Sequence, residues 1–186
     1  NEEAKKVKKA YLKYSGNRHT DAWLMLGDIA YYNGKDGDFQ VGLFENMYDE
    51  CLPNTVAWPT PGNHDLRSAN PETQTGPYFD IFSLPINGES GGYPSQTEAY
   101  YSFDYENIHF VSLDSEVSPR TVEGTMVNWL RKDLEMNQSE WLIVFFHQPP
   151  YTRGTHDSDN LSDSRGRMIE MRENVLPVLE LYSVDL

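Results

Sequence analysis

Three loops of this chain carry polar side chains that can bind metal ions. Each loop directly follows a short apolar run of the kind found in buried strands. The side chains are Asp28 and Tyr31 in the first loop, Asn63 and His64 in the second, and His147 in the third. The apolar runs cover residues 23–26, 55–58 and 141–146. Ligands of open α/β sheets bind at the carboxyl ends of the strands. The pattern therefore favours a metal site where three strands end.

The chemistry of these side chains suits iron, zinc or manganese. Asp28 offers a carboxylate that can bridge two cations, and Asn63 offers a neutral carbonyl oxygen. The phenolate of Tyr31 is a strong donor to Fe(III), because coordination removes a proton that otherwise leaves near pH ~10. With the imidazole of His147, the set suits Fe, Zn or Mn better than Ca or Mg. Two such ions ~3.5–4 Å apart would bind an ester phosphate and lower the pKa of a bound water.

Each residue taken singly also has a structural explanation. Asp28 and Asn63 follow glycines and could be capping or turn residues. Tyr31 could be packed or exposed, and His147 could be a buried histidine with satisfied hydrogen bonds. The joint pattern, in which three strands all end in donors, favours the metal site.

His64 is suited to a different task from its neighbour Asn63. It is a candidate for protonating a leaving alkoxide or for holding a phosphate oxygen. Asp65 either orients His64 or caps the following turn. The sequence leaves both roles of Asp65 open.

The composition narrows the class of protein. A length of 186 residues with 38% hydrophobic residues is enough for one domain with a sizeable core. The formal net charge of −14 argues against nucleic acid and anionic membranes as partners. Cys51 is the single cysteine, which excludes an internal disulfide and a thiolate metal cluster. No apolar window reaches the ~20 residues of a membrane span, and the charged start does not read as a signal peptide.

Helical and strand patterns alternate along the chain, which favours a layered α/β domain. We expect helices at 2–14, 40–52, 121–137 and from 165, the last either bent or restarted at Pro177. We expect strands at 22–27, 55–60 and 141–147, a hairpin over 99–104 and 108–114, and a beginning strand at 184–186. The polar loops fall at 33–38, 66–98 with a helical turn near 78–82, and 151–164. His109 lies in the hairpin and is predicted to be a packed or surface residue.

Three separated motifs together resemble the calcineurin-like metallophosphoesterases. They are Gly-Asp-x-x-Tyr at 27–31, Gly-Asn-His at 62–64 and Val-x-x-His at 144–147. Their order and spacing agree with the family as well as their letters do. The tyrosine of the first motif makes the chain similar to the purple acid phosphatases in particular. The resemblance implies a layered α/β/β/α sandwich, here in part.

The resemblance also implies a role for each residue of the motifs. Asp28 would bridge two metals, Tyr31 would bind Fe(III) and give a purple colour, and the second metal would be Zn, Fe or Mn. Asn63 and His147 would bind that second metal. His64 would contact the substrate and donate a proton. The family often places another substrate-contacting histidine in the loop after the last of these motifs, and His156 matches it.

Two motifs of the family are absent from residues 1–186. The aspartate of the first strand and the final Gly-His-x-His are both missing, and the iron site would keep only Asp28 and Tyr31. We therefore expect the chain to be the central part of one catalytic domain, truncated at both ends.

The function implied by the resemblance is that of an acid phosphatase. A metal-bound hydroxide would attack a phosphate monoester of a small molecule, with His64 as proton donor. The alternatives are a metal-poor, inactive fragment or binding protein on the phosphatase fold, and a phosphodiesterase or nucleotidase of the same superfamily, which Tyr31 opposes. The resemblance further implies a secreted or periplasmic protein.

Overall fold

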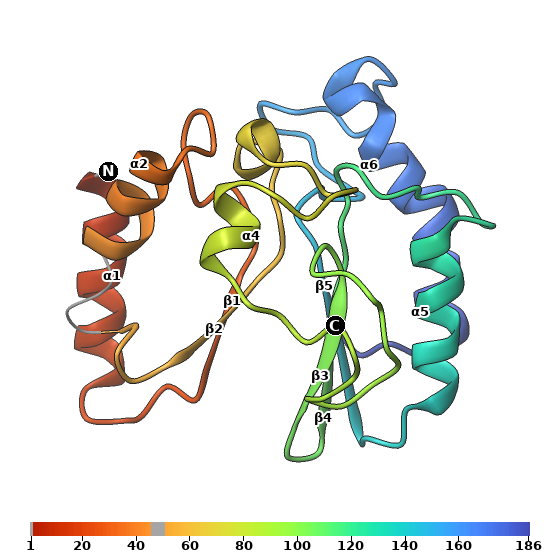
Figure 1. Ribbon diagram of the computed structural model, residues 1–186, viewed down its shortest axis with the longest axis horizontal. Helices are drawn as coiled ribbons and strands as arrows, with labels where there is room; N and C mark the ends of the chain where they lie inside the picture. The colour runs from red at the N-terminus through yellow and green to blue at the C-terminus, as the bar shows by residue number, and fades with distance from the viewer. Residues whose placement is uncertain (1, 46–50) are drawn as a thin grey trace.

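Two β-sheets lie face to face at the centre of the computed structural model, which describes residues 2–45 and 51–186 (Figure 1). The smaller sheet pairs β1 and β2 in parallel. The larger sheet has the order β3-β4-β5, with β3 antiparallel and β5 parallel to β4. The strands are β1 (Ala22–Met25), β2 (Val56–Pro59), β3 (Tyr101–Tyr105), β4 (Ile108–Ser112) and β5 (Trp141–Phe145). Apart from the strand expected to begin at 184–186, the predicted strands and hairpin are therefore present.

Aromatic packing joins the two sheets. The ring of Trp58 on β2 stacks on Phe103 of β3 with ring centroids 3.7 Å apart. The carbonyl of Pro59 accepts a hydrogen bond of 2.7 Å from the hydroxyl of Tyr101, which is fully buried. Beyond the strand end, Thr60 donates its hydroxyl to the carbonyl of Leu113 at 2.8 Å. These contacts hold the carboxyl ends of β2 and β4 close together.

Helices cover the outer face of each sheet, which completes the predicted α/β/β/α layering (Figure 1). On the side of the smaller sheet lie α1 (Glu2–Ser15) and α2 (Asp36–Phe39), the latter continued by a π-helical turn, η1 (Gln40–Phe44). On the side of the larger sheet lie α5 (Thr125–Met136), α6 (Arg167–Glu170), the π-helical turn η4 (Met171–Val175) and α7 (Leu176–Leu181). The long loop carries a 3₁₀ turn, η2 (Asp65–Ser68), and α4 (Pro77–Ile81), and a 3₁₀ turn, η3 (Asp163–Gly166), precedes α6. None of the described helices has the length and apolarity needed to cross a bilayer.

The helix predicted over 40–52 has a different start. It begins at Asp36, inside the segment that we expected to be a polar loop. Asp38 accepts hydrogen bonds from the backbone amides of Asn33 and Lys35, so the acidic residues of this segment form the first turn of the helix. Residues 46–50 of the predicted helix lie outside the described part of the chain.

The last residues of the chain hydrogen-bond to β5, although no strand forms at 184–186, where we expected one to begin. The amide of Asp185 donates to the carbonyl of Leu142 at 2.9 Å, and the amide of Val144 donates to Leu186 at 2.7 Å. β5 is therefore flanked on both sides by backbone hydrogen bonds.

Candidate metal and phosphate site

The loops that follow β1 and β2 meet at one edge of the sheet because the two strands run in parallel. A Cβ added to Gly27 would lie 2.8 Å from the amide nitrogen of Gly62. A Cβ added to Gly62 would lie 2.4 Å from Oδ1 of Asp28. Both positions need glycine because the two backbones approach too closely for a side chain. The backbone amide of His64 donates to Oδ1 of Asp28 at 3.0 Å, which links the two motifs directly.

Asp65 ties the same two loops together from beneath. Its carboxylate is fully buried and accepts the backbone amides of Ala30 at 2.8 Å and Gly62 at 2.9 Å. Burial raises the pKa of Asp65, although both amides act to lower it. Neither of the two roles that the sequence left open describes these contacts. The side chain holds the loops rather than the ring of His64 or the turn that follows.

Tyr31 and Asp28 are already paired. The hydroxyl of Tyr31 donates to Oδ2 of Asp28 at 2.7 Å. This hydrogen bond, together with partial burial and the charges of Asp28 and Asp65, raises the pKa of Tyr31 to about 12. The phenol therefore keeps its proton at neutral pH in the absence of a strong competing cation. A trivalent ion that takes the place of that proton would be bound by phenolate and carboxylate together.

His147 presents one ring nitrogen to Asp28. Its Nδ1 lies 2.8 Å from the carbonyl oxygen of Leu26, which can only accept, so Nδ1 carries a hydrogen. Its Nε2 lies 3.5 Å from Oδ1 of Asp28. Metal-binding histidines commonly have this arrangement, in which a backbone carbonyl fixes one nitrogen and the other faces the ion. Nε2 and the carboxylate oxygen face each other, and a cation between them would contact both.

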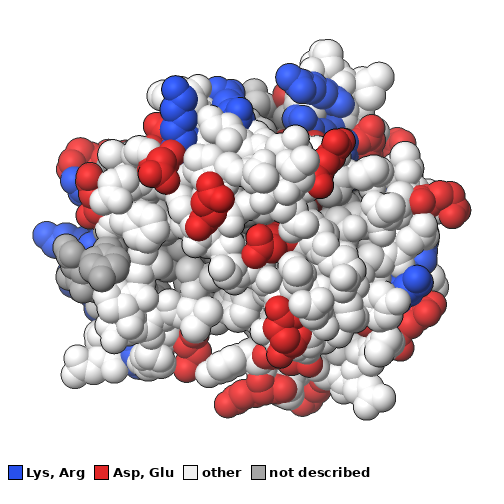
Figure 2. All heavy atoms as spheres, viewed as in Figure 1, with Lys and Arg blue, Asp and Glu red and all other residues white. Residues whose placement is uncertain are grey.

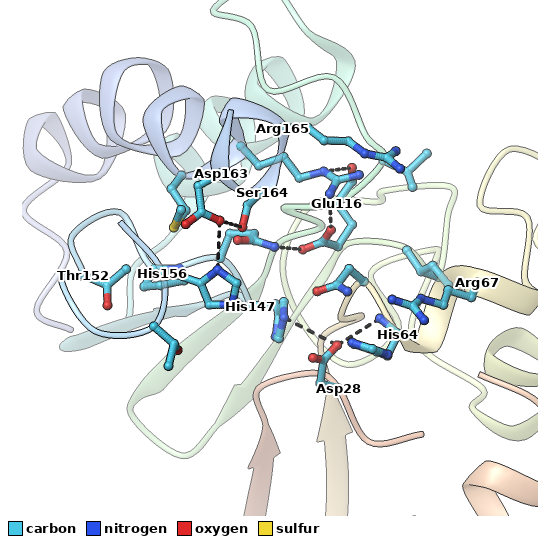
Figure 3. Close-up of a pocket in the computed structure, with 18 of the residues that line it drawn as sticks. Asp28, His64, Arg67, Glu116, His147, Thr152, His156, Asp163, Ser164 and Arg165 are labelled. Carbon is cyan, nitrogen blue, oxygen red and sulfur yellow. Dashed lines mark hydrogen bonds and ion pairs between the residues drawn. The ribbon is translucent and has the colours of Figure 1, made fainter. Parts of the chain in front are cut away.

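All six residues singled out in the sequence line one cavity of about 900 Å³ (Figure 3). Asp28, Tyr31, Asn63, His64 and His147 come from the loops after β1, β2 and β5. His156 comes from the loop at 151–164, and its Nδ1 lies 2.9 Å from Oδ1 of Asp163. The structure therefore brings the predicted set together, while the role of each residue stays a prediction.

The ring of His64 is fixed from two sides. Its Nδ1 lies 2.8 Å from the carbonyl oxygen of Tyr32. Its face packs against the ring of Tyr31 with centroids 4.2 Å apart. Because the carbonyl holds a hydrogen on Nδ1, a proton can be gained or lost at Nε2 without a change in ring orientation.

The side chains present fit a metal ion, but they are few. Within the described ranges, no three or more His, Cys, Asp or Glu side chains gather closely enough to hold a metal on their own. The candidate set contains one carboxylate, one imidazole, one phenol and one amide, contributed by Asp28, His147, Tyr31 and Asn63. These donor types suit Fe, Zn or Mn, as the sequence predicts.

A buried ion pair on the cavity wall escaped the sequence analysis. Nη1 of Arg167 lies 3.2 Å from Oε2 of Glu116, and Nε of the same guanidinium donates to the Glu116 carbonyl at 2.9 Å. Gln148 donates to Oε1 of Glu116 at 2.7 Å. Burial raises the pKa of Glu116, with Gln148 and Arg167 opposing it. The sequence did contain a signal for Glu116. Like the other site residues it follows a strand, β4, whose carboxyl end lies at the edge of the sheet where the site is.

The chain belongs to the calcineurin-like phosphoesterase family, whose model matches residues 3–186. It is similar to purple acid phosphatase 21 of Arabidopsis thaliana, with 30% identity over 143 residues, 73% of this chain and 30% of that protein. It is also similar to purple acid phosphatase 23 of the same plant, with 30% identity over 129 residues, 67% of this chain and 25% of that protein. The chain thus spans about a third or less of these curated relatives.

A solved structure has the same fold. It is described as GAP50, the anchor in the inner membrane complex of Plasmodium. The TM-score is 0.56 at 18% identity, over 95% of this chain and 57% of that one. At this identity the likeness concerns the fold alone.

Proposed function

We propose that this chain carries part of the catalytic site of a dinuclear metal-dependent phosphomonoesterase. Asp28 would bridge the two ions, Tyr31 would bind Fe(III), and Asn63 with His147 would bind a second ion, Zn, Fe or Mn. When bound, the ions would supply a hydroxide nucleophile and charge stabilisation for the phosphate. The observation that carries the proposal is Nε2 of His147 facing Oδ1 of Asp28 in a cavity shared with Tyr31 and Asn63.

His64 would serve as the proton donor to the leaving alkoxide. Its Nδ1 hydrogen is held by the carbonyl of Tyr32, so Nε2 is the nitrogen that exchanges a proton with the substrate. His156 would contact a phosphate oxygen from the opposite loop, where Asp163 orients its ring. A small phosphorylated substrate, and a secreted or periplasmic location implied by the resemblance alone, complete the proposal.

Hydrolysis of an aryl phosphate by the purified chain, with added Fe(III) and Zn(II), tests the proposal. Asn63→Ala should lower both the bound metal and the turnover, and the exposed Asn17→Ala is the matched control. His64→Ala should lower kcat by about a hundredfold or more, because general acid catalysis is worth that much. Activity that survives Asn63→Ala would overturn the ligand assignment, and unchanged turnover in His64→Ala would overturn the proton-donor role.

A binding protein on the phosphatase fold is the second candidate. It is favoured by the small number of candidate metal ligands, which among the described residues include one carboxylate, Asp28, and one imidazole, His147. The fold is also that of a protein described as an anchor. This candidate predicts that the chain does not hydrolyse the aryl phosphate, whether or not metal is added.

A further inference from the structure

The cavity is also lined by arginine side chains that form no ion pair with a carboxylate of the described chain. Three arginines line it: Arg67, Arg165 and Arg167. Arg167 is paired with the buried Glu116. Among the described residues, the side chain of Arg67 hydrogen-bonds only to a neutral group, the carbonyl of Tyr32, at 3.0 Å. The side chain of Arg165 makes no hydrogen bond or ion pair with any residue in the ranges 2–45 and 51–186. Two cationic charges are therefore open to an anion in this cavity.

The positive charges of these two arginines are opposite in sign to the net charge of the molecule. The formal net charge is −14, and acidic side chains are spread over the face shown in Figure 2, where blue side chains gather along the upper edge. An average surface of this chain repels anions. Two guanidinium groups without a paired carboxylate favour anion binding at this cavity, which also contains the carboxylates of Asp28 and Asp163.

The turn before α6 holds Arg165 at the cavity. Ser164, Arg165 and Gly166 all have positive φ, at 46°, 56° and 77°. Non-glycine residues rarely adopt this conformation, so the turn must be held by its surroundings. The carboxylate of Asp163 does so, since it accepts the amide of Asp157 at 2.8 Å and also contacts His156. Asp163 therefore links the loop that carries His156 to the turn that carries Arg165.

The two arginines reach the cavity from different elements. Arg67 lies on η2, directly after the loop that carries Asn63 and His64. Arg165 lies on the turn before α6, beyond Glu116 as Figure 3 draws it. A phosphate held beside Asp28 and His147 would occupy a small part of a cavity of about 900 Å³. Arg67 and Arg165 are among the residues that border the rest of the space.

We propose that Arg165 and Arg67 form a second anion subsite, which selects small phosphate esters that carry a second phosphate group. This rests on the proposed function, because it places the scissile phosphate at the candidate metal site. The second phosphate would accept charge-assisted hydrogen bonds from the guanidinium groups, whose planar fork matches phosphate oxygens. Arg167 stays with Glu116 and does not take part.

Equilibrium binding tests the subsite without relying on turnover. Calorimetric titrations with fructose bisphosphate and with fructose monophosphate would use the full chain with Zn(II) added, for the wild type, R165Q and R153Q. Arg153 is the matched control, because it is exposed, is paired with Asp159, and does not line the cavity although it lies on the loop of His156. Because Arg67 also supports the carbonyl of Tyr32, R67Q is the second variant, with its unfolding midpoint measured alongside.

The wild type should bind the bisphosphate more tightly than the monophosphate, and added salt should weaken that preference. R165Q should weaken bisphosphate binding on the order of tenfold and remove most of the preference. R153Q should match the wild type. No preference in the wild type, or equal weakening of both ligands by R165Q, would overturn the subsite.

Hydrolysis of an aryl monophosphate separates the two proposals. If no variant hydrolyses it while the Arg165-dependent preference persists, the proposed function fails and the subsite stands. If the wild type hydrolyses it and R165Q retains the full preference for bisphosphate, the subsite fails and the proposed function stands.

Discussion

Two of the histidines that face carboxylates, His109 and His147, have different surroundings. His109 is buried and uses both ring nitrogens, with Nδ1 2.6 Å from Oδ1 of Asp104 and Nε2 2.8 Å from Oδ2 of Asp133. His147 gives one nitrogen to a backbone carbonyl and leaves the other 3.5 Å from Asp28, at a cavity. We call His109 with Asp104 and Asp133 the closed group, because both ring nitrogens are occupied. We call His147 with Asp28 the open site, because one ring nitrogen faces the cavity.

In the closed group the polar side-chain atoms of His109 and Asp133 are all hydrogen-bonded, while Asp104 stays partly exposed beside a second cavity. Ser102 and the amide of Tyr93 both donate to Oδ1 of Asp133, at 2.7 and 2.6 Å. Both carboxylates accept from His109, which therefore carries two ring hydrogens. Burial acts to lower the pKa of His109, but Asp133 and Asp104 outweigh it, and the pKa is raised. The comparison teaches that a histidine–carboxylate pair indicates chemistry when a lone pair is left facing a cavity, and stability when every polar atom is satisfied.

His147→Ala should break the open pair and leave the fold intact. Loss of residues that only orient a metal ligand costs about 10–100-fold. Loss of a ligand itself should therefore lower aryl phosphatase activity at least about a hundredfold. The unfolding free energy should change by less than about 1 kcal/mol, because the side chain borders a cavity. Turnover and urea unfolding measure the two effects, and a large loss of stability with full activity would reverse the comparison.

His109→Ala should do the opposite. It leaves the buried carboxylate of Asp133 without its cationic partner, which costs about 3 kcal/mol of unfolding free energy. Urea denaturation measures this loss, with the exposed His19→Ala as the control. Specific activity per folded molecule should stay near that of the wild type. A destabilisation of a few tenths of a kcal/mol would show that the closed group does not stabilise the fold.

The closed group also predicts how stability depends on pH. The folded pKa of His109 is raised, so its contribution is fully present below the unfolded value of about 6.5 and is lost as pH rises through the folded pKa. One proton limits the slope to about 1.4 kcal/mol per pH unit. Unfolding free energies of the wild type and His109→Gln, measured across this window, should diverge toward low pH. Parallel curves would contradict the assignment.

Gly62→Ala should give a smaller effect that touches the open site alone. Its Cβ would lie 2.2 Å from the amide nitrogen of Asp28, so the two loops must separate. We expect a loss of about 1–3 kcal/mol in unfolding free energy, with a drop in metal affinity. Gly37→Ala is the control, since a Cβ there meets nothing within 4 Å. Metal affinity at the level of the wild type would show that the loops tolerate separation.

The sequence predicted which residues would gather at the open site because its signals are local. Apolar runs that end in Asp28, Asn63 and His147 mark strand ends, and parallel pairing brings such ends together. The layered fold followed from the alternation of strands and helices together with the family resemblance.

The remaining features depend on contacts between residues far apart in the chain. Nothing near His109 in sequence indicates Asp133, which lies on α5 and closes the group. The pairing of Glu116 with Arg167 likewise joins two separate segments and decides which cavity arginines stay free. The start of α2 was misplaced because glycines and aspartates in a short segment fit a loop and a helix start equally well.

The most direct test of the account is a titration of the purified chain with Fe(III), followed by visible absorbance. The account predicts a phenolate-to-iron charge-transfer band in the wild type and in Tyr32→Phe, whose exposed ring lies next to Tyr31, and no band in Tyr31→Phe. A band that persists in Tyr31→Phe, or wild-type protein that takes up no iron, would contradict the claim that these loops form a metal site.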